Sequence, residues 1–168
     1  MPESPDSVNV SATNAVADGY NRQGDARLTD PPMPAPWYRD GLRFTCTQCG
    51  DCCTGEPGNV WVNDADLDAI AEFRGEPVEE VRGLYTKKGS RGLSLREKLD
   101  GECVFFERGK GCTIYPVRPS QCRTWPFWES NVATPADWDE TCSICPGSGR
   151  GELISAEEIV KRSKVIRL

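Results

Sequence analysis

The sequence predicts a small, irregular α+β domain with short helices and a β-hairpin. Signals for helices and strands come in short stretches, separated by glycine- and proline-containing turns. Only 38% of the 168 residues are apolar, which limits the size of the core, yet nine are cysteines. Dense thiols in a reducing compartment are typical of metal or redox sites, so we expect metal to help organise the fold.

We predict three segments. Residues 1–36 hold six of the 13 prolines and no cysteine, which indicates a flexible tail. Residues 37–151 form the expected cysteine-cluster domain, and residues 152–168 the C-terminal helix. The first ten residues lack the charged and apolar regions of a signal peptide, and no apolar stretch suits a membrane span. The expected location is therefore the cytoplasm.

The first elements follow from residue pattern. Leu42–Thr45 is expected to be a strand, and residues 60–62 an extended piece after a turn at residues 55–58. Asn63 is a good N-cap for a helix that Gly75 can end. Pro77 is expected to open a second helix. Apolar residues in this region are assigned to the core: Trp61, Leu67, Ile70, Ala71, Phe73, Val78, Val81 and Leu84.

Later elements carry more of the cysteines. The basic segment KKGSRG at 87–92 predicts a solvated loop, and residues 103–115 predict a hairpin with Cys103 and Cys112 near its two feet. Pro119 with Ser120 is expected to start a short helical turn. Two further helices are predicted to begin at Thr134 with Pro135, and at Ser155, where Ser155 and Glu158 have capping-box spacing.

Eight cysteines form one pattern along the chain. A C-x-x-C-x-x-C-C run is followed by four separate cysteines: Cys46, Cys49, Cys52, Cys53, Cys103, Cys112, Cys122 and Cys145. The odd total argues against a disulfide framework, as does the adjacency of Cys52 and Cys53, which would strain a bond between them. Thiolates returning from distant segments are the ligands that zinc, iron or an iron-sulfur cluster uses.

The chain contains no histidine, so mixed cysteine-histidine zinc fingers, Rieske-type ligation and histidine-dependent zinc or iron sites are excluded. Sulfur must supply the ligands, with Asp51 as a possible minor one. The adjacent Cys52 and Cys53 are expected to point apart and to serve different metals. Eight thiols suit two four-thiolate ions, one bridged dinuclear site, or one cluster with some cysteines left free.

Metal thiolates are negative and need compensating groups nearby. Arg118 and Arg123 bracket Cys122 and are the expected cofactor-binding residues, and Arg43 is a further candidate. Three aromatic residues that follow them are expected to shield the site or fill the core: Trp125, Phe127 and Trp128.

Three segments together resemble the YkgJ-type CxxCxxCC cysteine-cluster family, described as a zinc- or iron-chelating domain. They are CTQCGDCC at 46–53, GCTIYPVRPSQCRTWP at 111–126 and CPGSGRG at 145–151. The resemblance covers residues 43–151 and implies metal chelation by the eight patterned cysteines. Cys142 is additional to that pattern.

Three function classes are compatible with these residues. The first is a metal-binding protein that chelates zinc or iron. The second is an iron-sulfur redox or electron-transfer protein, with Cys46, Cys49 and Cys52 at three corners of a cubane and a cysteine such as Cys122 at the fourth. The third is a metal-dependent enzyme with an open iron or zinc site, in which Cys53 or Cys142 is a reactive thiol.

The expected partners are metal ions. A formal charge of −6 without a basic stripe argues against nucleic-acid binding, and no segment predicts membrane association.

Overall fold

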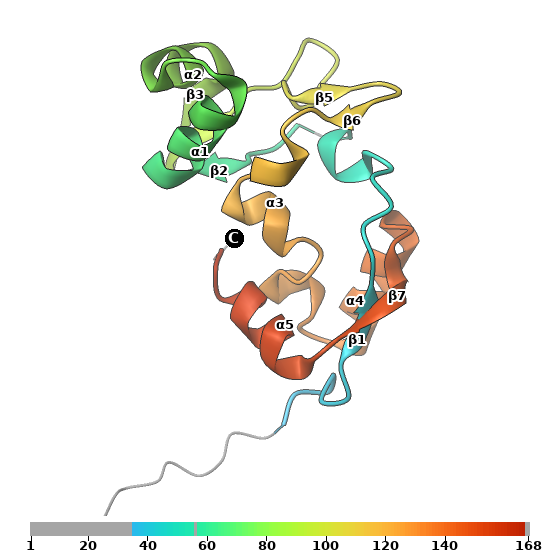
Figure 1. Ribbon diagram of the computed structural model, residues 1–168. Coiled ribbons are helices and arrows are strands. Elements are labelled where there is room, and N and C mark those ends of the chain that lie inside the picture. Colours follow the sequence, from blue (N-terminus) through green and yellow to red (C-terminus); the bar gives the residue numbers. More distant parts are fainter. Residues whose placement is uncertain (1–34, 56, 167–168) are drawn as a thin grey trace, which may run out of the picture. The chain divides into compact units, whose positions relative to one another are not determined.

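The computed structural model describes residues 35–55 and 57–166, and these combine short helices with small sheets (Figure 1). The predicted α+β class is confirmed. The expected tail lies outside the described residues as far as residue 34. In the described part of the chain, no helix has the length and apolarity that crossing a membrane requires.

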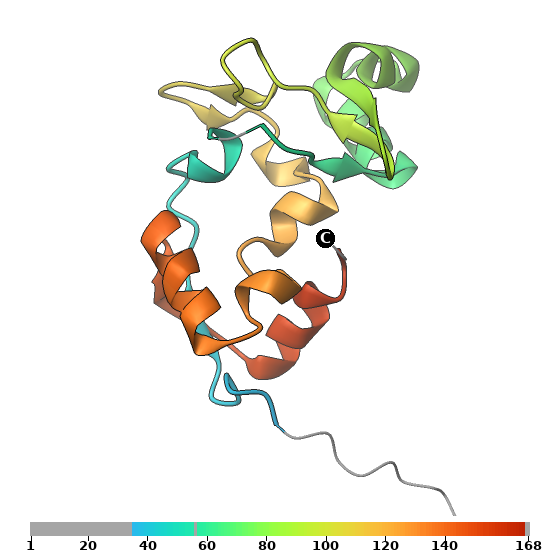
Figure 2. The same cartoon turned by 180° about the vertical axis from the view of Figure 1, so that it is seen from behind.

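The strands form three separate antiparallel sheets. The first pairs β1 (Leu42–Phe44) with β7 (Ser148–Ile154), which lie side by side in Figures 1 and 2. The second has the order β2-β4-β3, and the third is the predicted hairpin of β5 and β6. Their bounds are Trp61–Val62 for β2, Thr86–Gly89 for β3, Gly92–Leu95 for β4, Phe106–Glu107 for β5 and Gly111–Cys112 for β6.

Local capping signals predict the helix starts correctly. In α1 (Asp64–Arg74) the Asn63 side chain accepts a hydrogen bond from the Asp66 N–H, and the Asp66 carboxylate accepts one from the Asn63 N–H. Gly75 ends the helix in the left-handed conformation. The second helix, α2 (Val78–Tyr85), has Pro77 at its N-cap, one position before the first-turn site that proline usually takes.

The remaining helices start where their caps indicate. Pro119 precedes α3 (Ser120–Thr124), Thr134 caps α4 (Pro135–Ile144), and the Ser155 hydroxyl accepts from the Glu158 N–H at the start of α5 (Ala156–Ser163). Three short 3₁₀ turns complete the chain: η1 (Asp51–Cys53), η2 (Tyr115–Val117) and η3 (Glu129–Asn131).

The apolar side chains form two cores. The first core combines α1, α2, β4 and the segments flanking the hairpin: Leu67, Ile70, Ala71, Val81, Leu95, Phe105 and Ile114. The second core lies between β1, the segment after α3, α4 and α5: Leu42, Phe127, Val132, Trp138 and Ile159. The predicted C-terminal helix is therefore held by its own buried Ile159.

Two core predictions are wrong. Phe73 is 49% exposed because it comes six residues after Leu67, about 240° around a helix, and so leaves the buried face. Leu84 is 60% exposed, and Tyr85 packs against the first core instead, with its ring centroid 4.7 Å from that of Phe105. Trp61 is half-buried and covers Gly89, where any side chain would collide with its ring.

The loop prediction for 87–92 is wrong in part. Residues 86–89 and 92–95 pair as β3 and β4, leaving only the turn between them, because Leu95 is buried in the first core and anchors the register. The strand β7 also has no counterpart among the predictions. Its glycines disfavour strand formation locally, and its pairing with β1 joins residues about a hundred positions apart.

Candidate metal centre

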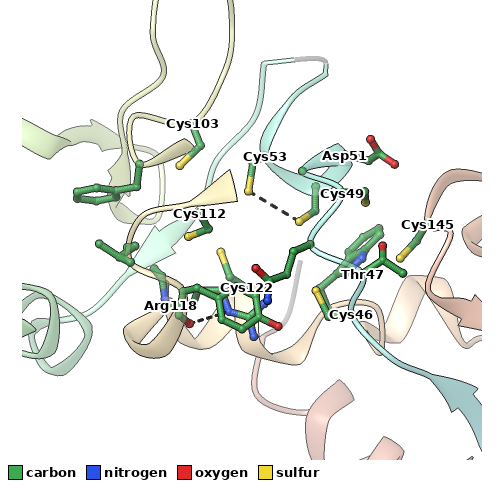
Figure 3. A pocket seen from close by; sticks show the side chains of 18 of the residues that line it. Cys46, Thr47, Cys49, Asp51, Cys53, Cys103, Cys112, Arg118, Cys122 and Cys145 are labelled. Atoms are coloured by element: carbon green, nitrogen blue, oxygen red, sulfur yellow. Dashed lines mark hydrogen bonds between the residues drawn. The ribbon is translucent and has the colours of Figure 1, made fainter. Parts of the chain in front are cut away.

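All eight patterned cysteines line one cavity of about 60 Å³, here called the thiol cavity. They reach it from different elements: the loop after β1, η1, the hairpin, α3 and the end of α4. Figure 3 shows the sulfurs of Cys53, Cys103, Cys112 and Cys122 facing a common space, with Cys145 farther along the wall. Leu95, Phe105 and Ile114 of the first core also line this cavity.

One wall of the cavity is the cysteine loop, residues 45–53. Its turn depends on Gly50, which has φ 90° and lies so close to the Phe106 ring that a Cβ would come within 2.4 Å. The Gly50 carbonyl accepts a 2.7 Å bond from the Cys53 N–H, which closes η1. Glycine is therefore required between Cys49 and Cys52 for the run to fold back toward the hairpin.

The other wall, here called the fixed wall, carries Cys103, Cys112 and Cys122. The Cys103 N–H donates to the Cys53 carbonyl at 2.8 Å, which ties this wall to the cysteine loop. Cys112 pairs with Phe106 across the hairpin, and both Cys103 and Cys112 pack against the first core. The predicted approach of these two cysteines on one hairpin agrees with this arrangement.

Buried polar groups fix the helix that presents Cys122. Asp66, only 4% exposed, accepts from both the Ser120 N–H and the Ser120 hydroxyl at 3.0 Å. Gln121, only 3% exposed, accepts from the Trp61 N–H at 2.8 Å and donates to the Asn59 carbonyl at 2.9 Å. The two residues before Cys122 are thus bonded to α1 and to the β2 segment, and α3 cannot rotate freely.

The adjacent Cys52 and Cys53 do not point apart, contrary to expectation. Their sulfurs are 3.9 Å from each other, and both residues line the thiol cavity. The 3₁₀ turn η1 produces this arrangement, because its backbone curls instead of alternating as a strand does. The Cys53 thiol as hydrogen-bond partner lowers the pKa of Cys52 to about 7, while the same bond, followed by burial, raises the pKa of Cys53.

Burial is the main cause of the pKa shifts of the three thiols of the fixed wall. It raises the pKa of Cys122 to about 12, and it also raises the pKa of Cys103 and of Cys112. Neighbouring thiolates add to the upward shift, whereas Arg118 opposes it at Cys112 and Cys122. Without a bound cation these thiols therefore hold their protons at neutral pH.

The two arginines that bracket Cys122 differ in position. Arg118 lines the thiol cavity, stacks over Tyr115 at 3.7 Å from the ring centroid, and donates from Nε to the Tyr115 carbonyl. Arg123 lies outside the cavity lining and is held by the Arg118 carbonyl, by the Ser120 hydroxyl and by an ion pair of 3.7 Å with Asp66. Arg43 is also outside, donating to the Gly151 carbonyl at 2.8 Å.

The ninth cysteine is placed apart from the eight. Cys142 packs against the second core and does not line the thiol cavity, whereas Cys145, one helical turn later, is buried in its wall. Phe127 fills the second core, and Trp125 lines the cavity with its ring 4.8 Å from that of Trp128. These aromatic residues both shield the cavity and fill the core, as expected.

Two residues that shape the site were not predicted from the sequence: Tyr115 and Gln121. Tyr115 lines the cavity, and a hydrogen bond with Cys46 is the main cause that raises its pKa. Gln121 was missed as the anchor of α3, although a polar residue directly before a candidate ligand is a usable signal. Its backbone partners belong to residues about 60 positions earlier, which no local pattern indicates.

The donor set fits a thiophilic ion. All nine cysteines are free thiols, and eight of them share the thiol cavity. Across residues 35–55 and 57–166, however, no three cysteine, aspartate or glutamate side chains already stand in a coordinating group. The walls carry suitable ligands that have not drawn together around a common point.

Comparison with known proteins agrees with these features. A model of the CxxCxxCC family, described as "Putative zinc- or iron-chelating domain", matches residues 45–146. The uncharacterized protein MJ0661 of Methanocaldococcus jannaschii is 32% identical over 91 residues, which make up 54% of this chain and 48% of that protein. The chain thus spans about half the length of this relative. No solved structure matches the chain.

Proposed function

We propose, from the premise that the chain belongs to the CxxCxxCC family, that it binds zinc or iron through the thiolates of its thiol cavity. One observation carries the proposal: eight cysteines from five separate parts of the chain line the same small cavity, and the one cysteine outside the family pattern does not. Core packing alone gives no reason for this selection among nine cysteines.

The residues nearest the common space are the best candidates to hold the metal. Five cysteines line the cavity on η1 and on the facing wall, and the sulfurs of the first two are 3.9 Å apart: Cys52, Cys53, Cys103, Cys112 and Cys122. The three outer thiols complete the set of expected ligands: Cys46, Cys49 and Cys145. The Cys103 N–H bond to the Cys53 carbonyl already holds the cysteine loop against the fixed wall.

The cavity supports a single centre better than two separated four-thiolate sites. Eight thiols line this one cavity, more than the four that one mononuclear zinc site uses, and this observation favours a polynuclear zinc or iron centre, including an iron-sulfur cluster, as the second candidate. Arg118 is the cation in the wall that offsets the thiolate charge.

Free thiols of this density are maintained in reducing surroundings, so we infer that the protein works in the cytoplasm. Zinc would supply a closed structural centre without redox activity, and thiolate-bound iron would supply redox chemistry.

The proposal is tested by purifying the full chain without oxygen and measuring zinc, iron and sulfide content with absorption and Mössbauer spectra. We expect a stoichiometric metal content that Cys122→Ser lowers severely and Cys142→Ser leaves intact, because only Cys122 lines the cavity. A folded protein without stoichiometric metal would refute the proposal. Equal losses in both variants would show that Cys142 is also a ligand.

A further inference from the structure

A second, larger hollow adjoins the thiol cavity. This groove of about 580 Å³ lies between β1, η2, the end of α3, β7 and α5, and is here called the basic groove. Five residues line both hollows: Phe44, Cys46, Tyr115, Arg118 and Trp125. A molecule in the groove would therefore lie directly beside the proposed metal centre.

The charges of the basic groove contrast with those of the whole chain. Four cationic and two acidic side chains line it, a formal excess of two positive charges, whereas the chain carries −6: Arg118, Arg123, Lys161 and Arg162 against Glu152 and Glu158. Glu158 is already compensated, because its carboxylate is 2.8 Å from Arg162 and 3.8 Å from Lys161. Arg123 is also 3.7 Å from Asp66, so among the described residues Arg118 is the lining cation for which no ion pair is found.

Arg118 is suited to anchor an anion where the two hollows meet. Its guanidinium is stacked flat on Tyr115, and it forms no ion pair with any carboxylate of residues 35–55 and 57–166. Stacking fixes the plane of its N–H fork, which lowers the entropy lost when a carboxylate or phosphate binds. Trp125 and Phe44 add ring surfaces beside this fork.

We propose that the basic groove binds a small organic anion, with a carboxylate or phosphate group on Arg118 and an apolar or ring-shaped part against Trp125. Lys161 and Arg162 of α5 supply longer-range attraction. The position of this ligand next to a metal rests on the proposed function, but the binding of the anion itself does not. The site makes the chain a receptor for a small anionic molecule in addition to a metal chelator.

The test is isothermal titration calorimetry of the full chain, as isolated without oxygen, with phenyl phosphate and benzoate at low ionic strength. Elemental analysis of the same samples reports the metal separately. We expect one saturable site whose affinity falls about tenfold in Arg118→Gln, the usual scale for a lost charge-assisted pair. The two probes distinguish a phosphate ligand from a carboxylate ligand.

A matched pair of lysines, one in α5 and one at its C-cap, keeps the test valid if Arg118→Gln loses metal. Lys161 lines the groove and is exposed, whereas Lys164, three residues later, is exposed outside it. Lys161→Gln should weaken binding about threefold and Lys164→Gln should leave it unchanged. Absence of saturable binding to both probes, or equal affinities for all variants, would overturn the inference, while a wild-type chain that binds the probes but carries no stoichiometric metal would overturn only the proposed function.

Discussion

The fixed wall of the thiol cavity is built into the first core, whereas the cysteine loop has little regular structure. Cys103 and Cys112 pack against buried apolar residues, and Cys122 follows two residues that are hydrogen-bonded to distant parts of the chain. Cys49 and Cys52 of the loop are exposed, and a few backbone bonds hold this segment. The three candidate ligands of the fixed wall are therefore positioned by folding, whereas the four of the cysteine loop are expected to depend more on bound metal.

The largest effect is expected from removing the support of the fixed wall. Phe105 is buried, lines the cavity and packs on Tyr85, so Phe105→Ala should lower the free energy of unfolding by about 3–5 kcal/mol and abolish metal binding. Phe73→Ala, an exposed phenylalanine, is the control and should change stability by less than about 0.5 kcal/mol. Denaturant unfolding measures the free energy of unfolding of both variants. A loss in Phe105→Ala as small as that in Phe73→Ala would contradict this role of the core.

A smaller loss is expected from freeing α3. Asp66→Ala removes the capping bond that its carboxylate accepts from the Asn63 N–H and leaves the Ser120 donors unpaired, at a cost of about 2–3 kcal/mol, with reduced metal content. Asp68→Ala, on the exposed face of the same helix, should change neither the stability nor the metal content. Asp66→Asn retains an acceptor oxygen and should restore most of the metal. Failure of that rescue would show that charge, rather than positioning, matters here.

Removing the metal should loosen the cysteine loop more than the fixed wall. With a strong chelator under reducing conditions, hydrogen exchange should rise in residues 45–53 while the Phe106 and Thr113 amides, both bonded within the hairpin region, stay protected. The reason is that the first core supports the hairpin without metal. Equal loss of protection in both walls would mean that the fixed wall also depends on metal.

The mildest test is thiol reactivity in the metal-free, reduced chain. Cys52 has a pKa of about 7 and Cys122 of about 12, and the thiolate is the reacting form. Cys52 alkylation should therefore level off above about pH 8 and fall roughly tenfold per pH unit below 6, whereas Cys122 alkylation should still rise up to pH 10. Mass spectrometry of iodoacetamide-treated samples measures both rates. A common midpoint would contradict the effect of burial.

Local chemistry in the sequence was sufficient for several features. The caps Asn63, Thr134 and Ser155 identified three helix starts, because a cap acts within four residues. The hairpin that carries Cys112 follows from two short strands around a glycine-rich turn. The absence of histidine and the cysteine spacing also gave the all-sulfur donor set and the family, since both are properties of residue type and order.

Only the tertiary structure decided which groups meet. The partnership of β1 with β7, the meeting of the Cys52 and Cys53 sulfurs on one cavity, and the exclusion of Cys142 depend on contacts or turns that no residue pattern encodes nearby. The same holds for Asp66, whose carboxylate accepts from the Asn63 N–H at the start of α1 but also reaches Ser120, 54 positions away. Packing of distant segments selects such pairs, and that selection depends on the whole set of buried contacts rather than on any one stretch of sequence.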